Sequence, residues 1–277
     1  MLLTLTMPPL IVAAFVFCFG VIIGSFLNVI IYRLHTSRSL AGRSHCLSCG
    51  VTLEWYDLLP LVSYLVLRAR CRSCAAVITP RYFLVELATG LLFVGVAFTS
   101  PWIVPVLIWW AVMAVLVVIV VYDYYHFIIP DALVGWLIAL ALTWHGYQWW
   151  QTEELSLFWY SALAATAAAG FFAALWAISR GRWLGLGDAK LAFPLGLLLP
   201  PAATFSFLVL SFWLGALISL AVIAWQYLRR RGQPHLRFLA QPLTIKSEVP
   251  FAPFLVLGFM CVYFWSIDAL QLVSFVF

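Results

Sequence analysis

Long apolar runs recur along almost the whole chain, and they constrain its fold more than any other feature. Of the 277 residues, 65% are hydrophobic and only 9% are charged, a balance that no ordinary soluble domain has. A helix needs about 20 apolar residues to cross a bilayer. Such runs predict spans at 8–32, 82–99, 102–122, 132–150, 156–178, 189–203, 204–228 and 252–274. The sixth run is the weakest, because Pro194, Pro200 and Pro201 interrupt it. We therefore expect an all-α polytopic membrane protein with about eight transmembrane helices.

The basic residues predict how the chain is oriented in the lipid bilayer. All fifteen Lys and Arg lie within 33–81, 180–190 and 229–237 or at Lys246, on one side of an eight-span topology. The positive-inside rule makes that side cytoplasmic. The start of the chain lacks a basic region and a small-residue cleavage site, so we expect the first span to remain. Because the basic residues flank spans, orientation explains them, and nucleic acid is not an expected partner.

Four cysteines form two tight pairs in the one long polar stretch of the sequence. They are Cys46-x2-Cys49 and Cys71-x2-Cys74, with 21 residues between the pairs. The spacing fits a four-thiolate metal site, and a reducing cytoplasm disfavours disulfides. We expect a structural Zn²⁺ ion; free or redox-active thiols, or iron in the same site, are the alternatives. The predicted division is a first transmembrane helix at 1–33, a cytoplasmic zinc module at 34–81 and a transmembrane core at 82–277.

An apolar run at 53–65 lies between the two cysteine pairs and is too short to span a bilayer. It predicts an amphipathic helix that lies on the membrane surface or against the spans.

Acidic side chains inside or beside apolar spans are functional candidates, because a membrane makes them costly. Those in this chain are Glu86, Asp123, Asp131 and Asp188. Asp123 ends the third span, and Asp131 follows Pro130 where it is expected to cap the next helix. Asp188 follows Gly185-Leu186-Gly187, and the two glycines let another backbone approach. A plain interfacial carboxylate at Asp123 and a helix cap at Asp188 are the structural alternatives.

Asp123 and Asp188 are expected at the same depth on the same side of the membrane. Two carboxyl groups that approach each other in such a place share a proton. One of them can then act as base on water while the other acts as acid toward a scissile amide. The pair therefore predicts an aspartic endopeptidase.

These residues together resemble the type IV prepilin peptidase family, which belongs to the Gly-x-Gly-Asp membrane aspartic proteases. Residues 24–34 are similar to its N-terminal signature, the cysteine pairs to its cytoplasmic domain, and residues 81–90 to the strip that follows. Asp123 with Ile129-Pro130-Asp131, and Gly185-x-Gly187-Asp188-x-Lys190, are similar to its two aspartate motifs. The chain departs from the family where Gly42 and Leu47 replace proline and where Ala252 replaces a common glycine.

The resemblance implies an enzyme of the bacterial inner membrane with Asp123 and Asp188 as its catalytic pair. It implies prepilin and pseudopilin substrates, cleaved at the cytoplasmic face, and in many members N-methylation of the new terminus by S-adenosylmethionine. No residue is assigned to the methyl donor. The candidates for substrate binding are Glu86, Gly185, Gly187 and Lys190. For Glu86, methyl-donor binding and a buried structural role are the alternatives.

Three other functions remain open at this point. The first is a peptidase without methyltransferase activity. The second is a transporter that uses Glu86, Asp123 and Asp188 as an ion path. The third is a scaffold whose zinc module docks a partner.

Overall fold

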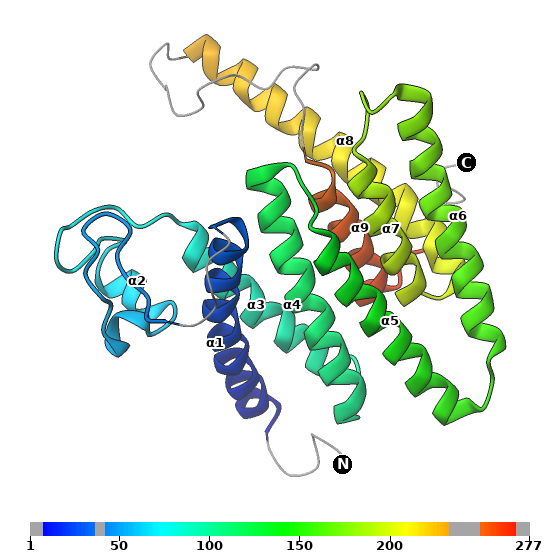
Figure 1. Cartoon of the computed structure of the whole chain (residues 1–277), viewed down its shortest axis with the longest axis horizontal. Coiled ribbons are helices and arrows are strands. Elements are labelled where there is room, and N and C mark those ends of the chain that lie inside the picture. Colours follow the sequence, from blue (N-terminus) through cyan, green and yellow to red (C-terminus); the bar gives the residue numbers. More distant parts are fainter. Residues whose placement is uncertain (1–7, 37–41, 233–249, 270–277) are drawn as a thin grey trace. The chain divides into compact units, whose positions relative to one another are not determined.

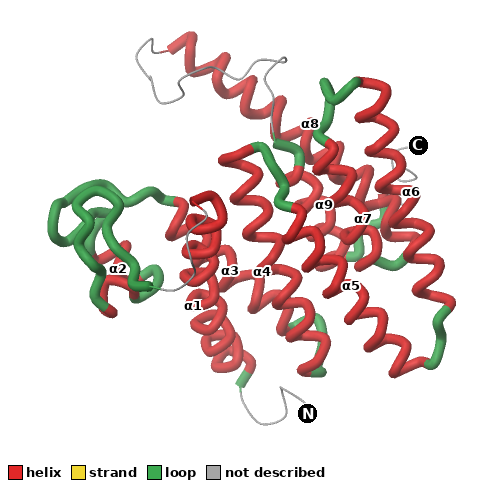
Figure 2. The backbone as a smooth tube through the Cα atoms, in the orientation of Figure 1, coloured by secondary structure: helices red, strands yellow, loops and turns green. Residues whose placement is uncertain are grey.

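The computed structural model of the chain describes residues 8–36, 42–232 and 250–269 (Figure 1). The chain divides into two compact units, residues 1–122 and 123–277, and each is treated by itself. Within the described residues all regular elements are helices, apart from two isolated β-bridges (Figure 2). The expected all-α fold is confirmed for this part of the chain.

Four helices of the described residues are long and apolar enough to cross a bilayer. They are α1 (Pro9–Thr36), α4 (Ile103–His126), α6 (Ser156–Ser179) and α8 (Pro201–Gly232). The remaining long elements are α3 (Arg81–Ala97), α5 (Asp131–Thr152), α7 (Leu186–Leu198) and the shorter apolar α9 (Ala252–Trp265). These helices make the chain a membrane protein. The count of eight spans stays a prediction, because α3, α7 and α9 are short and α5 is less apolar.

The first unit is built on a close antiparallel pair, α1 and α3. Glycines allow the approach: a Cβ on Gly20 would lie 2.9 Å from the Gly90 Cα, and a Cβ on Gly24 only 2.7 Å from the Glu86 Cα. Small residues of this kind let two membrane helices bring their backbones together. The pair therefore sets the level at which Glu86 lies against α1.

Aromatic packing ties the start of α4 to α3. The rings of Phe93 and Trp110 stack with centroids 5.0 Å apart, and the Trp110 indole N–H donates to the Phe93 carbonyl at 2.9 Å. Phe19 of α1 packs against both rings. This contact buries the indole N–H with a partner, as an apolar interior requires.

The apolar run between the cysteine pairs does not form the single helix that was expected. It contains a short 3₁₀ helix, η1 (Trp55–Leu58), and one turn of α-helix, α2 (Val62–Val66). Pro60 lies between them, and it disfavours helix at Leu59 and removes a backbone donor. The turn that results places Leu61 at a φ of 59°.

Helix α7 is the buried centre of the second unit. It contacts α5, α6, α8 and α9, and Leu191, Ala192 and Leu195 are fully buried (Figure 1). The predicted span at 189–203 differs from it, because α7 begins at Leu186 and ends at Leu198. Pro200 disfavours helix at Leu199, which is extended, and Pro201 begins α8. With 13 residues α7 is about 20 Å long, shorter than a hydrocarbon core of about 30 Å.

Three side chains from three other helices satisfy the buried C-terminal end of α7. The His145 Nε2–H donates to the Leu197 carbonyl at 2.8 Å, the Ser161 hydroxyl to the Leu199 carbonyl at 3.3 Å, and the Thr204 hydroxyl to the Gly196 carbonyl at 3.4 Å. The last carbonyls of a helix have no partner within it, and a buried end cannot use water. These bonds let α7 stop inside the protein.

The glycine contact between α1 and α3 predicts a stability difference between two matched variants. Gly24→Ala should lower the free energy of unfolding by about 1–3 kcal/mol, because the new Cβ meets the α3 backbone. Gly170→Ala on α6 is the control: no atom lies within 4 Å of its Cβ position, so it should be neutral or stabilising. Thermal unfolding in detergent compares them, and an unchanged Tm for Gly24→Ala would contradict the packing.

Candidate functional site

Asp123 lies in the last turn of α4, where the chain leaves the helix. Phe127 adopts a left-handed backbone with a φ of 54°, and its N–H donates to the Asp123 carbonyl at 2.8 Å. Residues 128–130 are then non-helical, and α5 begins directly after Pro130. The helix end therefore holds Asp123 at the base of a turn, with the residue only 5% exposed.

Asp188 lies in the first turn of α7. The extended residue Gly185 precedes the helix, and its N–H donates to the Asp188 carboxylate at 3.1 Å. Because Gly185 has no side chain, only this half of a capping box exists. Asp188 is 6% exposed. The cap that the sequence offered as an alternative role is present, and it holds the carboxylate of Asp188 in place.

The fold brings the two aspartates close enough for their charges to interact. The backbone N–H of Ala252 donates to the Asp123 carboxyl group. The Oδ2 of Asp123 is buried and has no hydrogen-bond partner among the described residues. A buried pair of carboxyl groups favours sharing a single proton. The unpaired oxygen is an acceptor that a water molecule or a substrate could use.

The segments that carry the aspartates are held together at the start of α5 and α7. A Cβ on Gly187 would lie 3.3 Å from the Ile129 side chain, so the glycine leaves room for that residue. The Lys190 ammonium group donates to the Asp131 carboxylate at 2.7 Å. The expected capping of α5 by Asp131 is wrong. Pro130 occupies the cap position without a side-chain bond, and Asp131 pairs with Lys190 instead.

The predicted substrate-binding residues thus lie in two places. Gly185, Gly187 and Lys190 surround Asp188 in the second unit. Glu86 belongs to the first unit, is 8% exposed, and accepts the Leu61 N–H at 2.8 Å and a bond from Ser25. These bonds favour the structural alternative for Glu86, because they join α3 to the cysteine module. The role of all four residues in binding substrate remains a prediction.

The four cysteines converge, as their spacing predicted. Their sulfur atoms all lie within 4.8 Å of one another, and the Cys46 and Cys74 sulfurs are 3.9 Å apart. Four sulfurs around a zinc ion at about 2.3 Å would be about 3.8 Å apart. The donor set therefore fits a tetrahedral metal ion.

Two matching turns build this cysteine cluster. In the first turn, the Cys46 carbonyl accepts the Gly50 N–H and the Cys46 N–H donates to the Val51 carbonyl, both at 2.9 Å. In the second turn, Cys71 makes the same two bonds with the Ala75 N–H and the Ala76 carbonyl, also at 2.9 Å. A β-bridge closes each turn, between His45 and Thr52 and between Arg70 and Val77. Gly50 and Ala75 hold equivalent positions with left-handed φ values of 73° and 55°.

The surroundings of the four thiols shift their pKa values in different directions. Backbone N–H groups of Cys49 and Ser48 lower the pKa of Cys46 to about 6. The backbone N–H of Ala76 lowers the pKa of Cys74, but desolvation and the three other sulfurs raise it to about 11. The four groups cannot all ionise cheaply together unless a cation neutralises them.

Two family models match successive parts of the chain. Residues 18–100 match the Bacterial Peptidase A24 N-terminal domain, and residues 110–220 match the Type IV leader peptidase family. The chain is 31% identical to the prepilin leader peptidase/N-methyltransferase of Aeromonas hydrophila, over 91% of this chain and 90% of that protein. The chain belongs to the type IV leader peptidase family.

Two further relatives with the name prepilin leader peptidase/N-methyltransferase differ in length. The protein of Myxococcus xanthus is 34% identical over 76% of this chain, and the match spans 63% of that relative. The protein of Klebsiella pneumoniae is 32% identical over 68% of this chain and 85% of its own length. No solved structure matches this member of the family.

Sequence reasoning missed two groups that the fold places in important positions. The backbone N–H of Ala252 reaches Asp123 from a distant segment, and Ala252 was noted only as a departure from the family pattern. His145 has no role predicted from the sequence, yet it is buried and its ring bonds to the Leu197 carbonyl at the end of α7. Neither role has a local sequence signal, because both depend on a contact between segments far apart in the chain.

The two matching turns predict opposite effects of exchanging glycine and alanine. Ala75→Gly should stabilise the metal-bound module by about 1 kcal/mol, because alanine resists a left-handed backbone. Gly50→Ala should destabilise it by a similar amount, since nothing but its φ opposes a Cβ there. Competition with a chromogenic chelator measures metal retention in both variants; effects of the same sign would contradict the equivalence of the turns.

Proposed function

We propose that this chain is a membrane-embedded aspartic endopeptidase that removes the leader peptide of prepilins and pseudopilins. The observation that carries the proposal is the buried pair of Asp123 and Asp188 at the ends of α4 and α7. The names of relatives at 31–34% identity support the substrate class. In this proposal the two carboxyl groups and a water molecule carry out the hydrolysis.

The geometry suggests how the pair would hydrolyse a peptide bond. The ionised carboxyl group takes a proton from water, whose oxygen attacks the scissile carbonyl carbon. The protonated carboxyl group gives its proton to the substrate, and the peptide C–N bond then breaks with the amine as the leaving group. The Gly185 N–H holds the Asp188 carboxylate and the Ala252 N–H holds Asp123, so both would be oriented before substrate binds.

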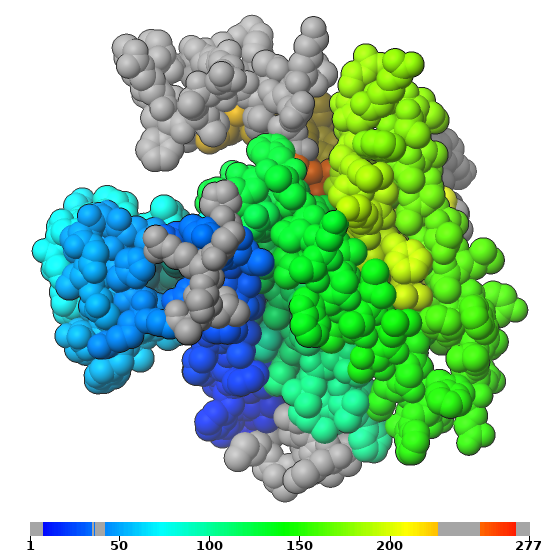
Figure 3. All heavy atoms as spheres, in the orientation of Figure 1, coloured from blue at the N-terminus to red at the C-terminus, as the bar shows by residue number. Residues whose placement is uncertain are grey.

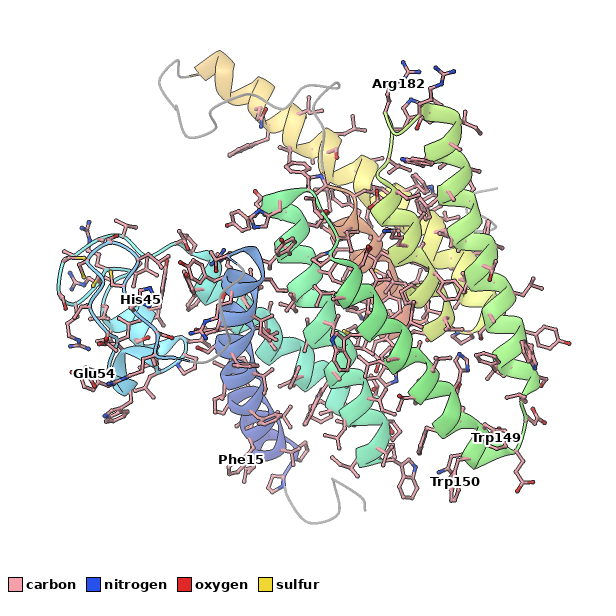
Figure 4. The ribbon with its side chains drawn as sticks, in the orientation of Figure 1. Phe15, His45, Glu54, Trp149, Trp150 and Arg182 are labelled. Atoms are coloured by element: carbon pink, nitrogen blue, oxygen red, sulfur yellow. The ribbon has the colours of Figure 1, made fainter. Side chains whose placement is uncertain are left out.

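We place the site at the cytoplasmic face of the bacterial inner membrane. Arg182 lies at the end of α6 that leads into α7, whereas Trp149 and Trp150 lie at the far end of α5 (Figure 4). Basic residues mark the cytoplasmic side and tryptophans gather at membrane interfaces. Asp188, six residues after Arg182, belongs to the basic end. A substrate leader on that side would meet the aspartates without crossing the membrane.

We further propose that the new N-terminal amine is methylated, as the second half of the relatives' name suggests. S-adenosylmethionine, when bound, supplies an electrophilic methyl group for a deprotonated amine. No described residue is assigned to the methyl donor. A peptidase without this second activity is the remaining variant of the proposal.

The four cysteines would hold a structural Zn²⁺ ion. Four thiolates complete a tetrahedral shell and leave no position for a reacting water, so the ion would stabilise the module and not take part in hydrolysis. We expect purified protein to carry zinc, and Cys46→Ser or Cys74→Ser to lose it. Cys18→Ser and Cys261→Ser are matched controls, because neither residue belongs to the cluster. Elemental analysis measures the metal content; zinc retained in Cys46→Ser would contradict the site.

Replacing either aspartate tests the peptidase mechanism directly. Asp123→Asn and Asp188→Asn should each reduce cleavage of a purified prepilin by about 10²- to 10⁴-fold or more. Both variants should keep the wild-type Tm or exceed it, because an amide avoids the cost of burying a charge. The control is Glu154→Gln, which changes an exposed carboxylate beyond the far end of α5. Mass spectrometry of the product reads both cleavage and the mass of an added methyl group.

The outcomes separate the competing functions. If both asparagine variants fold and fail to cleave, the dyad is supported against the ion-path and scaffold alternatives. Normal cleavage by either variant would overturn the mechanism. A wild-type product that is cleaved but never methylated would favour the peptidase without methyltransferase activity.

A further inference from the structure

The cysteine module of the first unit carries an exposed apolar stretch that no part of the peptidase mechanism uses. We call residues 55–66 the apolar wedge. Its exposed side chains are Trp55, Tyr56, Leu58, Leu59, Val62, Leu65 and Val66. Val66 is 71% exposed, and Leu65 is 63% exposed. A surface of this kind needs a partner, because water does not solvate a contiguous apolar patch well.

One hydrogen bond, from Leu61 to Glu86, fixes the level of the wedge along α3. The Leu61 N–H donates to the Glu86 carboxylate at 2.8 Å, and Glu86 packs directly against Gly24 of α1. Helix α1 continues for 12 residues beyond Gly24, to Thr36, which is about 18 Å. The wedge therefore lies beside the apolar body of α1 and not beyond its end.

Charged residues mark where the membrane surface meets these helices. Arg81 begins α3 and lies five residues, or about 7 Å, above the level of Glu86. Arg33 is the first charged residue of α1 after its apolar body. The Glu86 backbone thus lies roughly 7 Å inside the level of Arg81. Leu61 bonds to the end of the Glu86 side chain, which leans back toward Arg81, so its depth is at most about this value, in the range of about 5–10 Å at which interfacial segments insert.

The shape of the module agrees with this placement. Figure 3 shows the module as a rounded body directly beside α1, and Figure 4 shows Glu54 further toward the Phe15 end of α1 than His45, which precedes the first cysteine. The cysteine end is therefore the part further from the membrane interior, and the segment that follows Glu54 is the part nearer to it.

The charges of the module suit a phospholipid surface. Both acidic residues of the segment 54–66 are paired with arginine: Asp57 with Arg72 at 2.8 Å and Glu54 with Arg43 at 3.5 Å. The exposed Arg68 and Arg70 follow the wedge in sequence and add positive charge. Basic groups next to an apolar segment attract anionic headgroups, and paired carboxylates do not repel them.

We propose that the apolar wedge inserts into the lipid headgroup and upper acyl region of the leaflet at which α1 ends. The module is then an interfacial element anchored by the lipid and by the bond from Leu61 to Glu86. A γ-turn at Leu61, in which the Val62 N–H donates to the Pro60 carbonyl, reverses the chain within the wedge. This proposal does not depend on the aspartate chemistry.

A matched pair of fluorescent probes tests the insertion in the full-length protein. A small fluorescent amino acid replaces Leu65 in one variant and Leu47, which is 61% exposed and lies between the first two cysteines, in the other. Each is placed in nanodiscs of phosphatidylethanolamine and phosphatidylglycerol, in which both faces of the bilayer meet solvent. Nitroxide-labelled lipid should quench the probe at 65 severalfold more than the probe at 47, and iodide should do the reverse.

Two results would overturn the proposal. Equal and strong iodide quenching at both positions would show that water covers the wedge. Protection of position 65 from iodide without quenching by nitroxide lipid would show that protein covers it, whether a prepilin, another segment or a second copy. A probe at Val66 provides a second reading if the Leu65 variant does not purify as a monodisperse, metal-containing protein, and the same two results at Val66 carry the same meaning.

Discussion

The fold depends on how the buried helix α7 satisfies its two ends inside an apolar environment. In such surroundings every unpaired backbone group is costly, so a helix too short to reach water at both ends must find partners in the protein. At its start, the Gly185 N–H bonds to the Asp188 carboxylate. At its end, His145, Ser161 and Thr204 bond to the last carbonyls. Because these three residues come from α5, α6 and α8, the ends of α7 tie the second unit together and hold Asp188 in one position.

The need to pair buried polar groups also shapes the surroundings of the two aspartates. A carboxyl group at the N-terminus of α7 is stabilised by the helix dipole and by the Gly185 N–H, while Asp123 keeps an unpaired oxygen. Gly187 lets Ile129 lie against the start of α7, and Lys190 binds Asp131 across the same point. The two segments that carry the aspartates are therefore joined by two contacts, one between Gly187 and Ile129 and one between Lys190 and Asp131.

In the first unit, a buried carboxylate connects the small cysteine module to two apolar helices. The residue is Glu86, which faces Gly24 of α1 and accepts the N–H of Leu61. Burying a carboxylate costs free energy. Here the Glu86 carboxylate accepts the backbone N–H of Leu61, a residue whose positive φ few non-glycine residues adopt. The bond joins the module to α3, and it fixes the level of the apolar wedge along that helix.

The sequence by itself determined the class of fold, the cluster of four cysteines and the residues of the candidate dyad. Apolar length, paired cysteine spacing and isolated carboxylates at the ends of apolar runs are local signals that need no tertiary information. Tertiary structure alone decided that α7 ends at Leu198 and that Asp131 binds Lys190 and does not cap α5. It also decided that the Ala252 N–H bonds to Asp123 and that His145 bonds to the end of α7. Each of these depends on which group from a distant segment meets a given donor or acceptor. That choice is set by the packing of helices against one another, which the order of residues along one helix does not reveal.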